Sequence, residues 1–228
     1  MSSKDKIVTA VKNNQPEFRE LPPLPGSGTP ASAGQPAGHS PASPEQLASS
    51  PEQLANKFIS ILEAIGGVAY IVSGFDRIAS IVHEQHPDAR RIVSGCPELA
   101  ALAETATRYE DPHSLENIDL AVLRAHFGVA ENGACWITED LMIERALPFI
   151  TQHLALVIRK KDIVAHMHEA YERIAGLEST GTSYGFATFI AGPSKTADIE
   201  QSLVLGAHGP RSMTVFLLDE EMSDAGFY

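Results

Sequence analysis

Short apolar runs alternate with amphipathic stretches along the chain from residue 52 onward. The apolar runs predict buried strands at 68–72, 91–93, 118–123, 133–138, 154–158, 185–190 and 213–218. Apolar residues at helical spacing predict helices over about 51–64, 77–86, 97–106 and 161–174, with a further helix beginning near Ser194. Strands that are apolar throughout and alternate with helices are typical of a parallel sheet covered on both faces. The sequence therefore predicts an α/β fold with a mostly parallel wound sheet.

Two of the predicted strands, 118–123 and 133–138, leave no room for a helix between them. The sharp turn Glu131-Asn132-Gly133 precedes the second strand, and Asn-Gly supports the positive φ angles of a tight hairpin. We therefore expect a small antiparallel insert or β-hairpin within the wound sheet.

The first 51 residues differ in composition from the rest. Residues 4–14 have the spacing of a short amphipathic helix, and residues 21–51 are rich in Pro, Gly, Ser and Ala. Such a composition buries little apolar surface and is typical of a tether or a surface loop. We expect two parts: residues 1–51, a short helix and tether, and residues 52–228, the α/β domain.

A six-residue segment, Ser-Pro-Glu-Gln-Leu-Ala, occurs at 43–48 and again at 50–55. Each copy has Ser at the helix N-cap position, Pro at the first helical position and Gln at the third. The second copy is predicted to begin the helix that runs to about Ala64, where Gly66-Gly67 ends it.

The formal net charge of the 228 residues is −12. Such a chain repels phosphate backbones and anionic lipid headgroups, so we expect neither nucleic acid nor a membrane surface as a partner. No apolar stretch approaches the roughly 20 residues needed to cross a bilayer, and the N-terminus lacks the apolar region of a secretory signal. We therefore expect a cytoplasmic protein without a membrane span.

The chain has two cysteines, Cys96 and Cys135, far apart in sequence. This excludes a disulfide framework and also an iron–sulfur cluster held by this chain alone, which needs about four thiolates. Histidine spacing is poor for a metal site: His83 and His86 share a helix face, whereas His166 and His168 do not. We expect no metal or cofactor on this chain.

The segment 192–200 follows one predicted strand and opens a predicted helix. Backbone N–H groups at a helix start, beside two hydroxyls and a lysine, form a cradle for an anion. Ordinary N-cap and turn residues are the alternative interpretation. Two acidic residues there either balance the helix dipole or oppose an anionic ligand. The candidate ligand-binding residues of this segment are Gly192, Ser194, Lys195, Thr196, Asp198 and Glu200.

Two further candidates lie outside this segment. His208 is flanked by Gly206 and Gly209, so its imidazole can donate to a carboxylate or act as an acid or base; the alternative is a simple turn with His208 bonded to a carbonyl. Glu131, at the predicted hairpin turn, is either a nucleophile or substrate ligand, or a solvent-facing turn residue. We assign Glu131 and His208 as the candidate catalytic residues, and Gly206 and Gly209 as candidate ligand-binding residues.

The residues from Phe189 to Glu200, followed by those from Leu203 to Pro210, resemble the C-terminal signature of the lactate-utilization protein C family, the LUD domain. Upstream, Ala130-Glu131-Asn132-Gly133 is similar to the Ala-Glu-Thr-Gly turn of that family, with Asn132 in place of Thr. The resemblance covers roughly residues 55–219.

The resemblance implies a fold like that of ribose-5-phosphate isomerase, CoA transferases and formyltetrahydrofolate cyclo-ligase. It also implies a role in oxidising L-lactate to pyruvate beside two partner proteins that carry iron–sulfur clusters. We therefore expect an accessory subunit that binds a small carboxylate near Ser194, Lys195, His208 and Glu131.

Two alternatives remain open, and so does the question of whether the isolated chain is an enzyme. The turn at Glu131 is also similar to the Glu-Asn-Gly turn of CoA transferases, which implies acyl or CoA transfer with Glu131 as the nucleophile. The other alternative is a sensor of small carboxylates.

Overall fold

The computed structural model describes residues 9, 50–105, 111–179, 184–197 and 203–219. The chain divides into two compact units, Met1–Gln46 and Leu47–Tyr228. The helix expected at 4–14 and the tether expected at 21–51 lie almost entirely outside the described residues. The account that follows therefore concerns the second unit.

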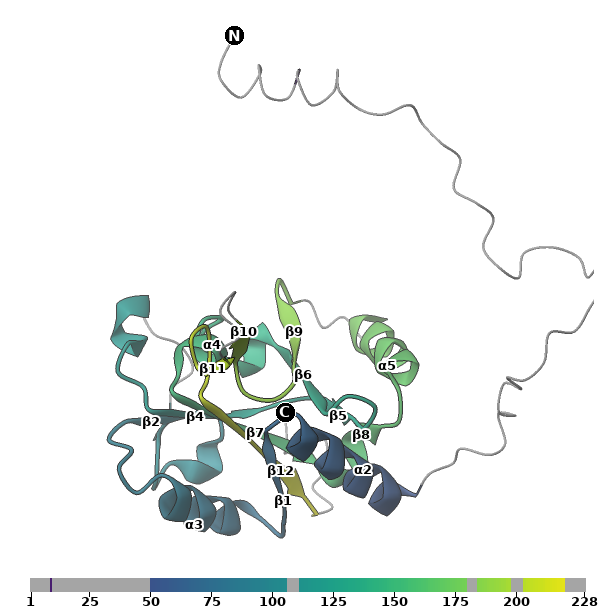
Figure 1. Ribbon diagram of the computed structural model, residues 1–228, viewed down its shortest axis with the longest axis horizontal. Coiled ribbons are helices and arrows are strands. Elements are labelled where there is room, and N and C mark those ends of the chain that lie inside the picture. The colour runs from purple at the N-terminus through teal and green to yellow at the C-terminus, as the bar shows by residue number, and fades with distance from the viewer. Residues whose placement is uncertain (1–8, 10–49, 106–110, 180–183, 198–202, 220–228) are drawn as a thin grey trace, which may run out of the picture. The chain divides into compact units, whose positions relative to one another are not determined.

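The main element of this unit is a parallel sheet of six strands in the order β1-β12-β7-β4-β2-β3 (Figure 1). Its strands are β1 (Val68–Val72), β2 (Ile92–Ser94), β3 (Glu104–Thr105), β4 (Leu120–Arg124), β7 (His153–Arg159) and β12 (Ser212–Leu218). Every residue of β4 is buried, as expected for a central strand covered on both faces. The predicted α/β fold with a mostly parallel sheet is confirmed.

Each face of this sheet has its own apolar core. On one face, Phe58 and Leu62 of helix α2 (Pro51–Ala64) pack with residues such as Leu156 of β7. On the other face, Ile78 of helix α3 (Phe75–Gln85) packs with residues such as Val157 of the same strand. Consecutive strand residues point to opposite faces of the sheet. A strand that is apolar at every position therefore contributes side chains to both cores.

Helix α2 begins as the repeat predicts. The Ser50 hydroxyl accepts from the Gln53 backbone N–H (3.2 Å), and the Gln53 side chain accepts from the Ser50 backbone N–H (3.0 Å). This reciprocal capping box satisfies two backbone donors that a helix start leaves free. The helix ends where the glycines predict, with Gly66 at φ +89°.

A second sheet of four strands, in the order β8-β5-β6-β9, contains the predicted antiparallel insert. Its strands are β5 (Phe127–Val129), β6 (Ala134–Thr138), β8 (Ile163–Val164) and β9 (Ala187–Ile190). Strands β5 and β6 form an antiparallel hairpin, and β9 adds antiparallel to β6. The expected pairing of 118–123 with 133–138 is wrong, because 118–123 contributes β4 to the parallel sheet and β5 is the strand that pairs with β6. Helix α5 (Met167–Ser179) follows β8, and an aromatic cluster around Phe127 and Trp136 packs between this helix and the sheet.

Three predicted helices differ from the structure. Over 97–106 the chain forms a short 3-10 helix, η2 (Pro97–Leu99), and then strand β3. The helix predicted from residue 161 begins only at Met167, after η5 (Lys160–Asp162) and β8, because Ile163 pairs with Gly128 of β5. Near Ser194 the chain forms strand β10 (Lys195–Ala197), which pairs antiparallel with β11 (Leu203–Leu205).

The remaining elements are short. They are the helix α4 (Leu147–Ile150) and the 3-10 helices η3 (Pro112–Leu115) and η4 (Glu139–Leu141).

Candidate functional site

The predicted ligand-binding segments 192–194 and 206–210 lie together and are called the loop pair below. The backbone N–H of Ser194 donates to the Pro210 carbonyl (2.9 Å), and the N–H of Gly206 donates to the Ser194 carbonyl (3.0 Å). Strands β10 and β11 extend this pairing, with Lys195 opposite Leu205. Two segments predicted separately from the sequence therefore form one structural feature.

Glycines allow the loop pair to close. Gly192 has φ +70°, and a Cβ atom there would lie 3.1 Å from the Ile65 carbonyl oxygen at the end of α2. Gly206 has φ +77°. A Cβ atom on Gly209 would lie 3.1 Å from that of Ser194. The expectation that glycine lets the backbone come close is confirmed at Gly209, where the two loops meet.

The predicted helix start at Ser194 is wrong, and with it the cradle of helix N–H groups. The Ser194 N–H is already bonded to Pro210, and the residues that follow form a strand rather than a helix. Antiparallel pairing with β11 outweighs the local resemblance to an N-cap, since tertiary context commonly overrides a weak local preference. Thr196 lies in this strand, whereas Asp198 and Glu200 lie outside the described residues.

Two candidate residues at the loop pair have exposed side chains: Lys195, in β10 directly after the first loop, and His208, in the second loop. A Cβ atom on Gly66 would lie 3.1 Å from the Lys195 Nζ, so the ammonium lies at the C-terminal end of α2. The negative end of a helix dipole favours a cation there. Within the part of the chain that the structure describes, no carboxylate pairs with the ammonium of Lys195.

Glu131 lies on the β5–β6 turn but is directed to another element. Its Oε2 accepts from the backbone N–H of Met167, the first residue of α5 (2.9 Å), and lies 3.8 Å from His166 Nδ1. Beside it, the Asn132 side chain accepts from the Ala134 N–H (3.1 Å). Both polar side chains of the turn are thus engaged in local structure, and Glu131 caps a helix.

The turn and the loop pair meet the same end of α2. A Cβ atom on Gly133 would lie 3.4 Å from Ile65 Cδ1, and one on Gly192 would lie 3.3 Å from the same atom. The structure therefore brings these two backbones together. The Glu131 carboxylate nevertheless faces α5, whereas the Lys195 ammonium faces the α2–β1 connection.

Buried charges at the carboxyl ends of the parallel strands were not identified from the sequence. Ligands commonly bind at this edge of an α/β sheet. Here Arg159 pairs with Asp162, which also pairs with Arg173 (2.5 Å), and Arg124 pairs with Glu98 (2.5 Å). These cations are matched internally by carboxylates. Arg159 and Asp162 are only three residues apart, whereas Glu98 and Arg173 come from elements that lie farther along the sequence from their partners.

The opposite edge of the sheet carries a cleft of about 1110 Å³, at the amino ends of β1, β12, β7, β4 and β2. Of its residues, the sequence drew attention to His86, through its spacing from His83, and to the adjacent basic pair Arg90-Arg91. His83 does not line the cleft; instead, the His86 ring lies against that of His153, at the start of β7, in a tilted arrangement.

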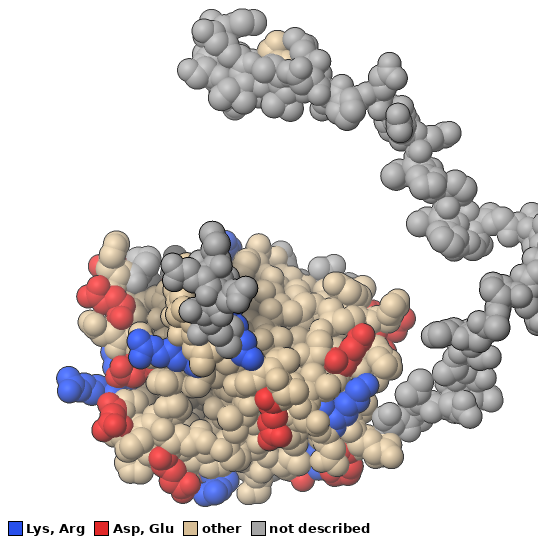
Figure 2. Space-filling model, viewed as in Figure 1, with Lys and Arg blue, Asp and Glu red and all other residues tan. Residues whose placement is uncertain are grey.

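Acidic and basic side chains are interspersed on the face shown in Figure 2. On that face, the described residues show no continuous basic stripe of the kind that follows a phosphate backbone. Among the described residues, no three His, Cys, Asp or Glu side chains gather as a metal site. In the same residues, every helix is too short or too polar to cross a membrane.

Comparisons with known proteins identify the family. The model of the LUD domain matches residues 83–218. Lactate utilization protein C from Bacillus pumilus is 32% identical over 117 residues, which are 51% of this chain and 49% of that protein. The protein YkgG from Escherichia coli, which is described as uncharacterized, is 23% identical over 167 residues, covering 73% of this chain and 69% of its own.

The structure of a DUF162 family protein from Deinococcus radiodurans shares the fold: the match covers 75% of this chain and 99% of that one, with a TM-score of 0.59 and 20% identity. The chain spans about half the length of the lactate utilization C proteins from Bacillus pumilus and Shouchella clausii. Because the family model matches well over half of the sequence, the chain belongs to the LUD domain family.

Proposed function

We propose that this chain is an accessory subunit of an L-lactate utilization system that oxidises L-lactate to pyruvate, and that its loop pair binds a small carboxylate. Relatives named lactate utilization protein C support the system. The observation that carries the carboxylate site is the convergence of two glycine-containing loops beside the ammonium of Lys195. The exposed imidazole of His208 adds a second donor on the same loops.

The electron-transfer groups are proposed to lie on two iron–sulfur partner proteins. This chain has two cysteines, Cys96 and Cys135, which are buried in the cores on opposite faces of the central sheet. Burial raises the pKa of Cys96 to about 11 and raises the pKa of Cys135 as well. Cluster ligands are thiolates, about four of them, so these two separated thiols favour clusters on other chains.

Co-purification tests the system. The tagged chain is expressed in its own cells growing on L-lactate, and the co-purifying proteins are identified while lactate-dependent dye reduction is measured. We expect iron–sulfur proteins and activity to accompany it. Recovery of the chain alone, together with unchanged growth on L-lactate after its deletion, would refute the accessory role.

Calorimetry with the purified chain tests the carboxylate site, with L-lactate and pyruvate as probes. Lys195→Gln removes a charge-assisted contact and is expected to weaken binding about tenfold. Lys57→Gln, at an exposed position on α2, is the matched control and should leave binding unchanged. Equal affinities for the wild type and the Lys195 variant would contradict the assignment of the carboxylate site to the loop pair. Binding without any effect on lactate oxidation would instead indicate a sensor.

The acyl-transfer alternative requires a carboxylate that is free to attack an acyl group. The Glu131 carboxylate accepts a hydrogen bond from the Met167 N–H. This structural role is sufficient to explain a glutamate on the turn, with no catalytic role needed. We therefore favour the accessory role. Hydroxylamine trapping of Glu131 in the presence of acyl-CoA, with the chain alone, would overturn this preference.

A further inference from the structure

The cleft at the amino ends of the parallel strands is separate from the loop pair. It is formed where strands far apart in sequence begin side by side, so its floor is the start of β12, β7 and β4. Its ionisable lining residues are His86, Asp88, Arg90, Arg91, Glu116, Asp119, His153 and Arg211. Small-molecule sites are concave and carry a few convergent polar groups, and this cleft has that form.

Two histidine rings are in contact within the cleft. The ring centroids of His86 and His153 lie 4.5 Å apart, with the planes inclined by 42°. The Nδ1 of His153 also forms a hydrogen bond with the Ser212 hydroxyl (2.7 Å). Burial, and then the neighbouring His153, lower the pKa of His86; burial, and then Arg211, lower the pKa of His153. Nearby Asp119 partly opposes the second shift. Both shifts favour the neutral imidazoles near pH 7.

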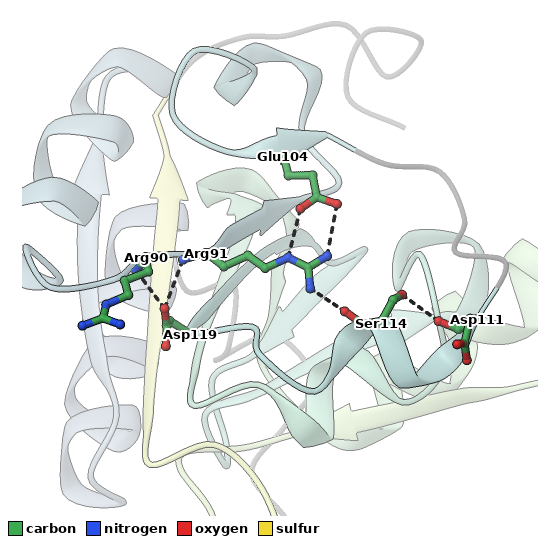
Figure 3. A network of polar contacts seen from close by, with 6 residues as sticks. All are labelled: Arg90, Arg91, Glu104, Asp111, Ser114 and Asp119. Carbon is green, nitrogen blue, oxygen red and sulfur yellow. Dashed lines mark hydrogen bonds and ion pairs between the residues drawn. The ribbon is translucent and has the colours of Figure 1, made fainter.

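Two guanidinium groups reach the cleft and form no ion pair among the described residues, although the charge of Arg90 acts on the nearby Asp119 carboxylate. Arg211 is held by its backbone N–H, which donates to the Gln152 carbonyl (2.8 Å), and its side-chain stem packs beneath Gly206. The side chain of Arg90 extends away from that of Arg91 (Figure 3). In a chain of net charge −12, these cations lie beside the imidazole pair.

One of the carboxylates that line the cleft, Asp119, accepts hydrogen bonds from the backbone. Asp119 accepts from the backbone N–H groups of Arg90 (2.7 Å) and Arg91 (3.0 Å), and these bonds lower its pKa. The guanidinium of Arg91 turns outward to Glu104 and the Ser114 carbonyl (Figure 3). The wall is thus rigidly hydrogen-bonded, which leaves Arg90 and Arg211 as the guanidiniums available to a ligand.

We propose that this cleft binds a small molecule bearing an oxyanion, either a carboxylate or a phosphate, through Arg211 and the His86–His153 pair. Guanidinium and imidazole N–H groups are the usual donors to such oxygens, and Arg matches them with two parallel hydrogen bonds. A bound anion also favours the protonated imidazole, so binding takes up protons. The site lies beyond the proposed function of the loop pair and uses none of its residues.

The test follows the imidazole resonances of the full-length, ¹⁵N-labelled chain by NMR during separate titrations with inorganic phosphate and pyruvate. The resonances of His86 and His153 report the cleft, and those of His208 report the loop pair. We expect saturable shifts at His86 and His153 with at least one probe, and a raised pKa for both rings. A response to phosphate alone identifies a phosphorylated ligand class, and a response to pyruvate alone identifies a carboxylate.

Two variants make the assignment specific. Arg211→Gln keeps the stem beneath Gly206 but removes the charge, and it should weaken binding at the cleft about tenfold. Arg77→Gln, on the exposed face of α3, is the matched control and should bind like the wild type. No shift of His86 and His153 with either probe, or full affinity in the Arg211 variant, overturns the proposal. Lys195→Gln should leave cleft binding intact, so failure of the loop-pair site and failure of the cleft are distinguishable.

Discussion

The carboxylate of Glu131 accepts a hydrogen bond from the backbone N–H of Met167, with 2.9 Å between the two atoms. Glu131 lies on the β5–β6 turn, and Met167 is the first residue of α5. A carboxylate at a helix N-terminus satisfies a free donor and complements the positive end of the dipole. The contact therefore joins the hairpin of the second sheet to the helix that covers it.

Replacing Glu131 with Ala should lower the free energy of unfolding by about 1 kcal/mol, because the first turn of α5 loses its carboxylate cap. Glu131→Gln keeps an oxygen acceptor and should recover most of that loss. Urea denaturation of the two variants measures the difference. A stability equal to wild type in Glu131→Ala, combined with lost lactate oxidation, would instead indicate that the carboxylate acts chemically.

Gly133→Ala should destabilise the fold by about 1–3 kcal/mol. The residue has φ +69°, which costs an L-residue about 1–2 kcal/mol, and a new Cβ would lie 3.1 Å from the backbone of Leu62 in α2. The matched control is Gly176→Ala within α5, where a Cβ meets nothing within 4 Å. That change should raise stability by about 0.5–1 kcal/mol. Thermal or urea unfolding checks both signs, and destabilisation by both variants would contradict the argument.

The protein should lose stability as the pH falls below about 6.5, the ordinary pKa of histidine. Burial is the largest cause of the lowered pKa of His86, His126 and His153 in the folded chain. Below pH 6.5 the unfolded chain therefore binds more protons than the folded one, and protonation favours unfolding. Above that pH the contribution is complete and constant.

Melting temperatures between pH 7.5 and 5.5 measure this effect. A His126→Gln variant should show a shallower decline, since it removes the most buried of the three rings. Inorganic phosphate should also reduce the decline if the cleft binds an oxyanion, because the ligand favours protonated His86 and His153 in the folded state. A melting temperature independent of pH over this range would show that these imidazoles are not held in their neutral form.

Elements whose signals lie within a few residues were predictable from the sequence. The Ser50–Gln53 capping box and Gly66 are sufficient to bound α2. The apolar runs at β7 and β12 are buried on both faces of the sheet. A continuous apolar run predicts such a strand even when its pairing partners are unknown. The Asn-Gly turn predicted a hairpin ending in β6, but its other strand is β5 and not the expected 118–123, which is β4 of the parallel sheet. The loop pair was identifiable only as two separate motifs that resemble one family.

Elements that depend on a distant partner were mispredicted. Residues 195–197 follow a Gly-Pro-Ser segment that suits a helix start, yet they form a strand because Leu203–Leu205 pairs with them. Ile163 has the spacing of a helical residue, yet it pairs with Gly128 of β5. In both places the backbone hydrogen bonds of a sheet, made across the fold, outweigh a weak local preference.

The sequence by itself determined the fold class, the bounds of α2, and membership of a family through its glycine-containing signature. Only the tertiary structure decided that Glu131 caps α5 and that the rings of His86 and His153 are in contact. A parallel sheet places the starts of its strands side by side although they are separated along the chain by whole helices. The side chains that line the cleft therefore share no sequence spacing, because the packing of the sheet alone makes them neighbours.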